Sequence, residues 1–156
     1  MVEKQKQVSD YFPADHLGEI KEVITEVERR TSGEIRVKIV IDCDPDLKGK
    51  VHEQAVRDFE KAGMHNTRDK IGVLILVVLN ERTFTILGDS GIYSKLLQGY
   101  WDNMARVMSI YFKNGNFYVG ICAVVESVGR QLAKHFPKQM DDVNELPDDV
   151  IVRGDN

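Results

Sequence analysis

The sequence predicts an α/β fold, a three-layer α/β/α sandwich around a small mixed sheet. The first observation is the almost continuously apolar run 71–79, which is typical of a central strand covered on both faces. The second is the turn at 80–82 into the alternating run 83–87, which predicts a hairpin. The third is the presence of amphipathic helical segments before and after this hairpin. Together they favour helices on both faces of a sheet with at least three strands.

The first helix is expected from about Pro13 to Arg30, because apolar residues recur there at helical spacing along one face. Thr31-Ser32-Gly33 ends this helix. In the following segment, Glu34–Ile41, apolar residues alternate with Arg36 and Lys38. This period predicts a strand with one wetter face, lying near an edge of the sheet.

A polar loop over residues 42–49 leads to a helix from about Val51 to Ala62, and the chain then enters the central strand. This strand–helix–strand order predicts a right-handed crossover with parallel strands. The starts of the two strands should therefore lie side by side, which places Glu34 beside the start of the central strand.

Three further helical segments are expected after Asp89. They are a short turn near Ile92 to Leu97, a helix from about Tyr100 to Phe112, and a helix from about Asn116 to Phe136 whose wide apolar face should lie on the sheet. We interpret the chain as one α/β domain over residues 1–137 followed by an acidic C-terminal tail over residues 138–156. The apolar residues of the tail are expected to pack either on the body or on a second subunit, and they are Val143, Leu146, Val150 and Val152.

The overall composition fits a single globular domain and excludes several classes of protein. The chain has 156 residues, of which 42% are hydrophobic, and it carries 25 acidic against 21 basic residues. This balance gives no basic field for a nucleic acid. Its two cysteines match no metal or redox spacing. No apolar run approaches the roughly 20 residues of a membrane span, so a cytoplasmic protein is expected.

Four carboxylates are predicted to gather at one edge of the sheet. The hairpin returns Asp89 to where the central strand begins, Asp69 stands just before that strand, and Glu34 joins them through the parallel pairing. Asp102 enters on the first turn of a following helix. Such a cluster would repel itself, and a hard divalent cation with oxygen ligands would resolve the conflict. The alternative is that these residues are solvated turn acids and helix-terminus charges.

A second acidic run gives weaker signals. The residues Asp42, Asp44, Asp46 and Glu53 have the outer spacing of an EF-hand, but Leu47 replaces the required glycine. The same run resembles the nucleophile motif of haloacid dehalogenase-type phosphatases, without the later residues that complete that site. The commoner explanation is a solvated loop. Serine-nucleophile, phosphate-loop and zinc-protease motifs are absent from the sequence.

Most of the chain resembles the TPM domain family, which is named after a thylakoid-lumen acid phosphatase and its relatives, and specifically its soluble bacterial branch. The resemblance lies in motifs spread from the first helix to the tail: Thr31-Ser32-Gly33-Glu34-Ile35-Arg36-Val37, Gly63-Met64-His65-Asn66-Thr67, Gly72-Val73-Leu74-Ile75, Gly88-Asp89-Ser90-Gly91-Ile92, Tyr100-Trp101-Asp102, Phe112-Lys113-Asn114-Gly115, Gly120-Ile121-Cys122, His135-Phe136-Pro137 and Asp142-Val143-Asn144-Glu145-Leu146-Pro147.

The resemblance implies the α/β/α fold with a Rossmann-like arrangement. It also implies divalent cations, chiefly Ca²⁺ with Mg²⁺ or another ion as alternatives, held by loop carboxylates. By this match, Glu34, Asp69, Asp89 and Asp102 are the expected metal ligands. Other branches of the family maintain or assemble membrane complexes, which implies a calcium-dependent interaction module with an unidentified protein partner. Some plant members have a weak acid phosphatase activity, so the alternative is a metal-assisted phosphomonoesterase. The segment 88–92 departs from the Gly-Tyr-Gly-Leu-Glu pattern of the anchored branches.

Overall fold

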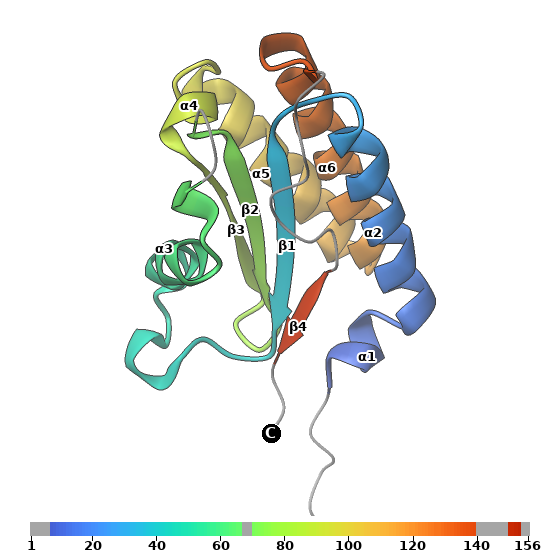
Figure 1. Ribbon diagram of the computed structural model, residues 1–156. Coiled ribbons are helices and arrows are strands. Elements are labelled where there is room, and N and C mark those ends of the chain that lie inside the picture. The colour runs from blue at the N-terminus through green and yellow to red at the C-terminus, as the bar shows by residue number, and fades with distance from the viewer. Residues whose placement is uncertain (1–6, 67–69, 140–149, 154–156) are drawn as a thin grey trace, which may run out of the picture.

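A mixed four-stranded sheet forms the centre of the protein, in a computed structural model that describes residues 7–66, 70–139 and 150–153 (Figure 1). The strand order is β3-β2-β1-β4, with β2 parallel to β1 and antiparallel to β3. The predicted hairpin and parallel crossover are therefore confirmed. The strands are β1 (Glu34–Val40), β2 (Gly72–Val78), β3 (Thr83–Gly88) and β4 (Ile151–Arg153).

Helices cover both faces of the sheet, as the sequence predicts. In Figure 1, α3 lies on one face, and α2, α5 and α6 lie on the other. The short helical turn expected near Ile92 begins earlier, at Ser90, because Asp89 caps it. The helices are α1 (Val8–Tyr11), α2 (Ala14–Glu28), α3 (Val51–Lys61), α4 (Ser90–Tyr93), α5 (Gln98–Lys113) and α6 (Phe117–His135), with short 3₁₀ turns η1 (Pro45–Leu47) and η2 (Met64–Asn66).

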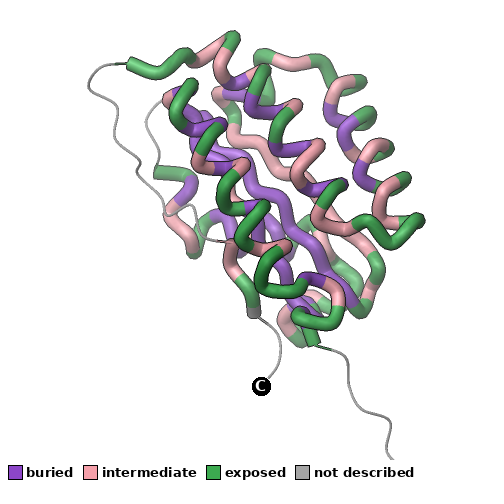
Figure 2. Tube along the Cα trace, turned by 90° about the vertical axis from the view of Figure 1, so that its right-hand side faces the viewer, coloured by how far each residue is buried: buried purple, intermediate pink, exposed green. Residues whose placement is uncertain are grey.

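The two faces of the sheet are packed into separate cores. Side chains of a strand alternate between faces, so Val73 and Ile75 of β2 face α2, α5 and α6, while Leu74 and Leu76 face α3. All seven residues of β2 are buried, which explains its continuous apolar sequence. Figure 2 shows the buried strands passing between helices whose outer turns are exposed. None of the helices in the described residues is both long and apolar enough to cross a bilayer.

β1 lies next to an edge of the sheet, as the sequence predicts, because it pairs with β2 on one side and with the three-residue edge strand β4 on the other. Its alternating polar residues do not mark a wet face. Lys38 points to the α3 side of the sheet and is only 8% exposed, because a carboxylate of α3 meets it there. A polar residue that pairs with a buried carboxylate thus produces the same sequence pattern as a solvent-exposed strand face.

The fourth strand comes from the segment that the sequence analysis treats as an acidic tail. Ile151 to Arg153 pair in parallel with Lys38 to Val40 of β1. Val150 packs against the larger core. For Val150, packing on the body is therefore confirmed. Val152 is 43% exposed, and Val143 and Leu146 lie outside the described residues.

Helices α2 and α6 pack unusually closely at Gly129. A Cβ atom added there would lie 2.5 Å from Cγ1 of Val27. We expect Gly129→Ala to lower the free energy of unfolding by about 1–3 kcal/mol, because the added methyl overpacks this contact. Gly18→Ala in α2, where an added Cβ meets nothing within 4 Å, should raise the same quantity by about 0.5–1 kcal/mol. Urea unfolding of both variants tests the pair, and equal effects would contradict the close packing.

Candidate functional site

The amino ends of β1 and β2 bring two of the predicted carboxylates to one edge of the sheet. Glu34 lies opposite Gly72 in the parallel register. On the other side of β2, the backbone N–H of Asp89 donates to the carbonyl oxygen of Gly72 over 2.8 Å. The backbones of Glu34 and Asp89 therefore flank the same residue of β2, as the hairpin argument predicts. We call Glu34 and Asp89, with the residues around Gly72, the acidic edge.

The two carboxylate oxygens of Asp89 differ, because one accepts a hydrogen bond and the other has no hydrogen-bond donor among the described residues. Oδ1 accepts a hydrogen bond of 2.8 Å from the backbone N–H of Ser90 and caps α4. Oδ2 is buried, and no described residue donates a hydrogen bond to it. A buried carboxylate oxygen without a donor is costly unless water or a cation meets it. The chemistry of this atom therefore fits a hard cation.

Asp102 is connected to the acidic edge only indirectly. It is exposed on the first turns of α5, where its Oδ1 accepts a 3.1 Å hydrogen bond from Nε2 of Gln98. The Gln98 side chain also accepts a hydrogen bond from the hydroxyl of Tyr93, in α4. Asp89 and Asp102 are thus joined to the beginning and the end of the same short helix.

Trp101 packs against α4 and against the end of β3. Its ring stacks on Tyr93 with centroids 5.6 Å apart, and its Cη2 atom would lie 3.2 Å from a Cβ atom added to Gly88. A side chain at position 88 would therefore require the ring to shift by a few tenths of an ångström. The indole is 6% exposed and neighbours Asp102 in sequence. The one tryptophan of the chain is therefore placed where it can report on the acidic edge.

The structure gives positions for three of the four predicted ligands, and it does not test their role as ligands. Glu34 and Asp89 share one edge, Asp102 is linked to it through α4, and Asp69 lies outside the described residues. Within those residues no group of three or more histidine, cysteine, aspartate or glutamate side chains is placed to hold a metal ion. The four-residue metal site remains a prediction.

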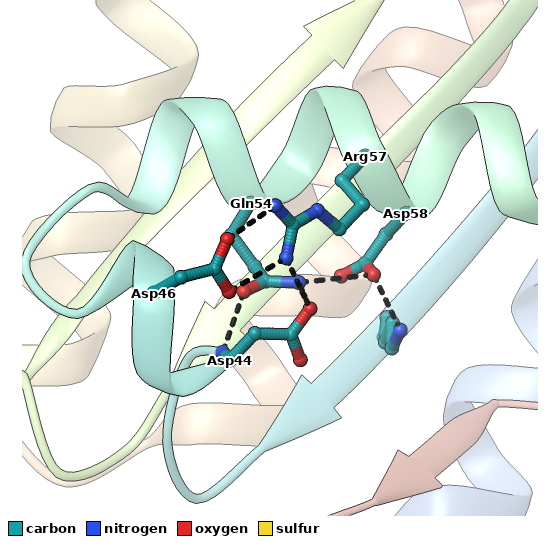
Figure 3. Close-up of polar contacts among 6 residues, drawn as sticks. Asp44, Asp46, Gln54, Arg57 and Asp58 are labelled. Carbon is teal, nitrogen blue, oxygen red and sulfur yellow. Dashed lines mark hydrogen bonds and ion pairs between the residues drawn. The ribbon is translucent and has the colours of Figure 1, made fainter.

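A buried polar network between β1 and α3 is the feature that the sequence analysis missed (Figure 3). The ammonium of Lys38 lies 2.8 Å from Oδ1 of Asp58. Gln54, one helical turn before Asp58, donates to that Oδ1 over 3.1 Å and to Oδ2 of Asp44 over 3.2 Å. Arg57 extends the network to the surface, with ion pairs of 2.9 Å to Asp44 and 2.6 Å to Asp46.

This network gives the second acidic run a structural role. The carboxylates of Asp46 and Asp44 raise the pKa of the Arg57 guanidinium, and Arg57 in turn lowers the pKa of Asp46. With Arg57 between them, Asp44 and Asp46 are ion-paired acids and not the ligands of an EF-hand. The i, i+4 pair of Gln54 and Asp58 on an otherwise apolar helix face was the available sequence signal.

The two cysteines are packed side chains with neutral thiols. Burial, and then the nearby Glu81 carboxylate, raises the pKa of Cys43 to about 12. Burial also raises the pKa of Cys122 to about 11. Since the thiolate is the nucleophilic form, neither cysteine is activated for covalent chemistry.

Comparisons with known proteins agree with this architecture. A family model described as the TPM domain matches residues 7–131. The NMR structure of the BA42 protein from the psychrophilic bacterium Bizionia argentinensis is 33% identical in sequence and has a TM-score of 0.83. The match covers 95% of this chain and 99% of that one.

A second structure shows the same fold at much lower identity. It is the N-terminal domain of the cg2496 protein from Corynebacterium glutamicum, solved by NMR, with 13% identity and a TM-score of 0.59 over 85% of this chain and 86% of that one. No curated protein is similar enough to this chain to count as a match.

Proposed function

This chain belongs to the TPM domain family, and from that premise we propose that it binds a divalent cation, chiefly calcium, at the acidic edge and acts as a metal-dependent interaction module. The observation that carries the proposal is the buried Oδ2 of Asp89, which no described residue satisfies. Calcium takes six to eight oxygen ligands and accepts irregular geometry, so carboxylates from separate elements suit it better than they suit magnesium.

The proposed ligands come from three places in the chain. Asp89 at the end of β3 and Glu34 at the start of β1 would bind from the two sides of Gly72. Asp69 is proposed as a third ligand that precedes β2. Asp102 is proposed as a ligand or as an outer carboxylate whose position Gln98 fixes.

A cation bound here would act mainly on α4. This helix has only four residues. It begins after the cap Asp89 and ends at Tyr93, whose side chain contacts Gln98 and Trp101. Neutralising the carboxylates would favour one position of α4 and of the neighbouring surface. Docking of a protein partner on that surface would then depend on the ion.

The test is calorimetric titration of metal-stripped protein with calcium and with magnesium, comparing the native chain with Asp89→Asn. Asparagine keeps an oxygen that caps α4 but removes the charge. We expect the native chain to bind calcium and to gain about 2.7 kcal/mol of unfolding free energy at an ion concentration of about 100 times Kd. Asp89→Asn should lose both effects. Asp15→Asn, an exposed aspartate in the first turn of α2, is the matched control and should keep both.

Absence of binding heat in the native chain would refute the cation site. Equal binding in Asp89→Asn and the native chain would move the site away from Asp89. Hydrolysis of a phosphate monoester should be followed in the same samples. Turnover that requires calcium and falls in Asp89→Asn but not in Asp15→Asn would instead favour the metal-assisted phosphomonoesterase.

A further inference from the structure

A groove of about 770 Å³ lies at the end of the sheet opposite the acidic edge. Its base is apolar and aromatic, with Val77 at the end of β2, Phe84 in β3, Phe112 in α5 and Phe117 in α6. Phe112 packs edge to face against the other two phenylalanines, with centroid distances of 5.5 Å to Phe84 and 5.3 Å to Phe117. The rings therefore give the groove a fixed wall.

The rim of the groove is positively charged although the chain as a whole has a formal net charge of −4. Three cationic side chains line it, from Arg82 in the hairpin turn and from Arg106 and Lys113 in α5, and no carboxylate among the described residues does. None of the three forms an ion pair with another described residue. Arg106 donates a single hydrogen bond, of 3.2 Å, to the side chain of Asn103. The charge of the rim is thus not balanced within the described part of the chain.

The position of the groove is typical of binding sites in α/β proteins, because ligands of open parallel sheets bind beyond the carboxyl ends of the strands. Val77, Val78 and Leu79, which line the groove, are the carboxyl end of β2. In Figure 1 the hairpin that follows β2 is at the lower end of the sheet and α4 is at the upper end. The groove is therefore separate from the proposed cation site.

The turn that carries Arg82 is itself unusual. Arg82 has a φ of 50°, in the left-handed region that glycine and asparagine normally occupy in hairpin turns. Its backbone N–H donates to the carbonyl oxygen of Leu79 over 3.1 Å, which closes the turn. An arginine in this conformation costs about 1 kcal/mol or more, and such strain is concentrated at functional positions. The turn conformation places the guanidinium of Arg82 at the rim of the groove.

We propose that this groove docks an acidic segment of a partner protein, with an apolar side chain of that segment inserted against the phenylalanines. Charge complementarity selects an anionic partner. Arg106 and Lys113 are seven residues apart in one helix, which at 1.5 Å per residue separates their backbones by about 10 Å. An extended peptide rises about 3.3 Å per residue, so carboxylates three residues apart match this spacing.

Exposed side chains on the groove suit such an occupant. Ile110, which also lines it, is 55% exposed between Arg106 and Lys113 on α5. An apolar residue flanked by cations provides the contact core and the polar rim of a small protein interface. The inference does not depend on calcium, because none of the groove residues belongs to the acidic edge.

The probe is a fluorescein-labelled peptide in which aspartate recurs every third residue around a central phenylalanine. Binding is measured by fluorescence anisotropy with the full chain, in a chelator so that the cation proposal has no influence. We expect saturable binding that weakens with salt. A peptide with asparagine for aspartate, and one with serine for the phenylalanine, should each bind at least about tenfold more weakly.

Charge reversal then locates the site. Arg106→Glu combined with Lys113→Glu should weaken peptide binding by at least about tenfold, because both cations of α5 become repulsive. The matched control is Arg130→Glu combined with Lys134→Glu, which makes the same change of net charge at exposed positions of α6 outside this groove. Equal circular dichroism and thermal midpoints of the two double variants show that both are folded.

No binding of the acidic peptide up to about 1 mM, or equal loss in the groove and control variants, would overturn the inference. Binding of oleate in place of the peptide would also overturn it and would assign a lipid occupant. Concentration-dependent dimers that the groove variant alone abolishes would assign the groove to a second copy of this chain.

Discussion

Asp58→Ala is expected to lower the free energy of unfolding by about 3–5 kcal/mol, because it leaves the Lys38 ammonium buried without its carboxylate. The side chains of Lys38 and Asp58 are 10% and 2% exposed, and their N–O distance is 2.8 Å. Gln54 would lose one of its two carboxylate acceptors at the same time. Urea unfolding followed by circular dichroism measures the loss.

Two controls separate the buried charge from general damage to the network. Asp46→Ala removes a carboxylate that is 64% exposed from the same network and should cost about 1 kcal/mol or less. Lys38→Met combined with Asp58→Leu removes both buried charges and should recover most of the stability that Asp58→Ala loses. If Asp58→Ala cost no more than Asp46→Ala, Lys38 would not be buried as described.

Trp101→Ala is expected to lower the free energy of unfolding by about 3–5 kcal/mol, since it empties the space between Tyr93 and Gly88. This ring also makes an edge contact with Tyr100, at a centroid distance of 5.6 Å. Removing it should loosen α4 and with it the cap that Asp89 provides. Calcium affinity should then fall as well, provided that the cation binds at the acidic edge.

Trp101→Phe keeps an aromatic ring and should recover more than half of that stability. The native chain offers an independent readout, because Trp101 is its one tryptophan and its fluorescence reports on this region alone. Thermal unfolding of the two variants and fluorescence of the native chain test the same packing. A loss below about 1 kcal/mol in Trp101→Ala would show that α4 is held by other contacts.

The long helices and the hairpin could be predicted from the sequence because their signals are local, whereas the four-residue helix α1 was not predicted. The apolar run 71–79 and the alternating run 83–87 became β2 and β3, and the helix expected from Asn116 to Phe136 became α6. Strand β4 could not be predicted in this way. Its three residues follow a long acidic segment and pair with β1 only because the fold leaves that side of β1 open.

Part of the candidate site could also be predicted, since topology alone places Glu34 and Asp89 on the two sides of Gly72. The connection of Asp102 to that edge required the structure, because it passes through Gln98 and Tyr93. The groove lined by Arg82, Arg106 and Lys113 could not be predicted either, because it also depends on tertiary packing. Arg82 and Lys113 are distant in sequence, and only the packing of α5 beside the hairpin gathers their charges.

The sequence by itself determined the fold class, the family and which residues lie at each end of the sheet. These features depend on the hydrophobic period of each segment and on the order of the segments along the chain, which are local properties. Only the tertiary structure decided how the polar residues inside this frame are used. In the sequence Lys38 has the pattern of a solvated residue, whereas in the structure Asp58 of α3 lies 2.8 Å from it. Asp44 and Asp46 have the spacing of cation ligands, whereas in the structure both form ion pairs with Arg57. The role of a charge depends on the partner that neutralises it, and that partner is chosen by long-range packing.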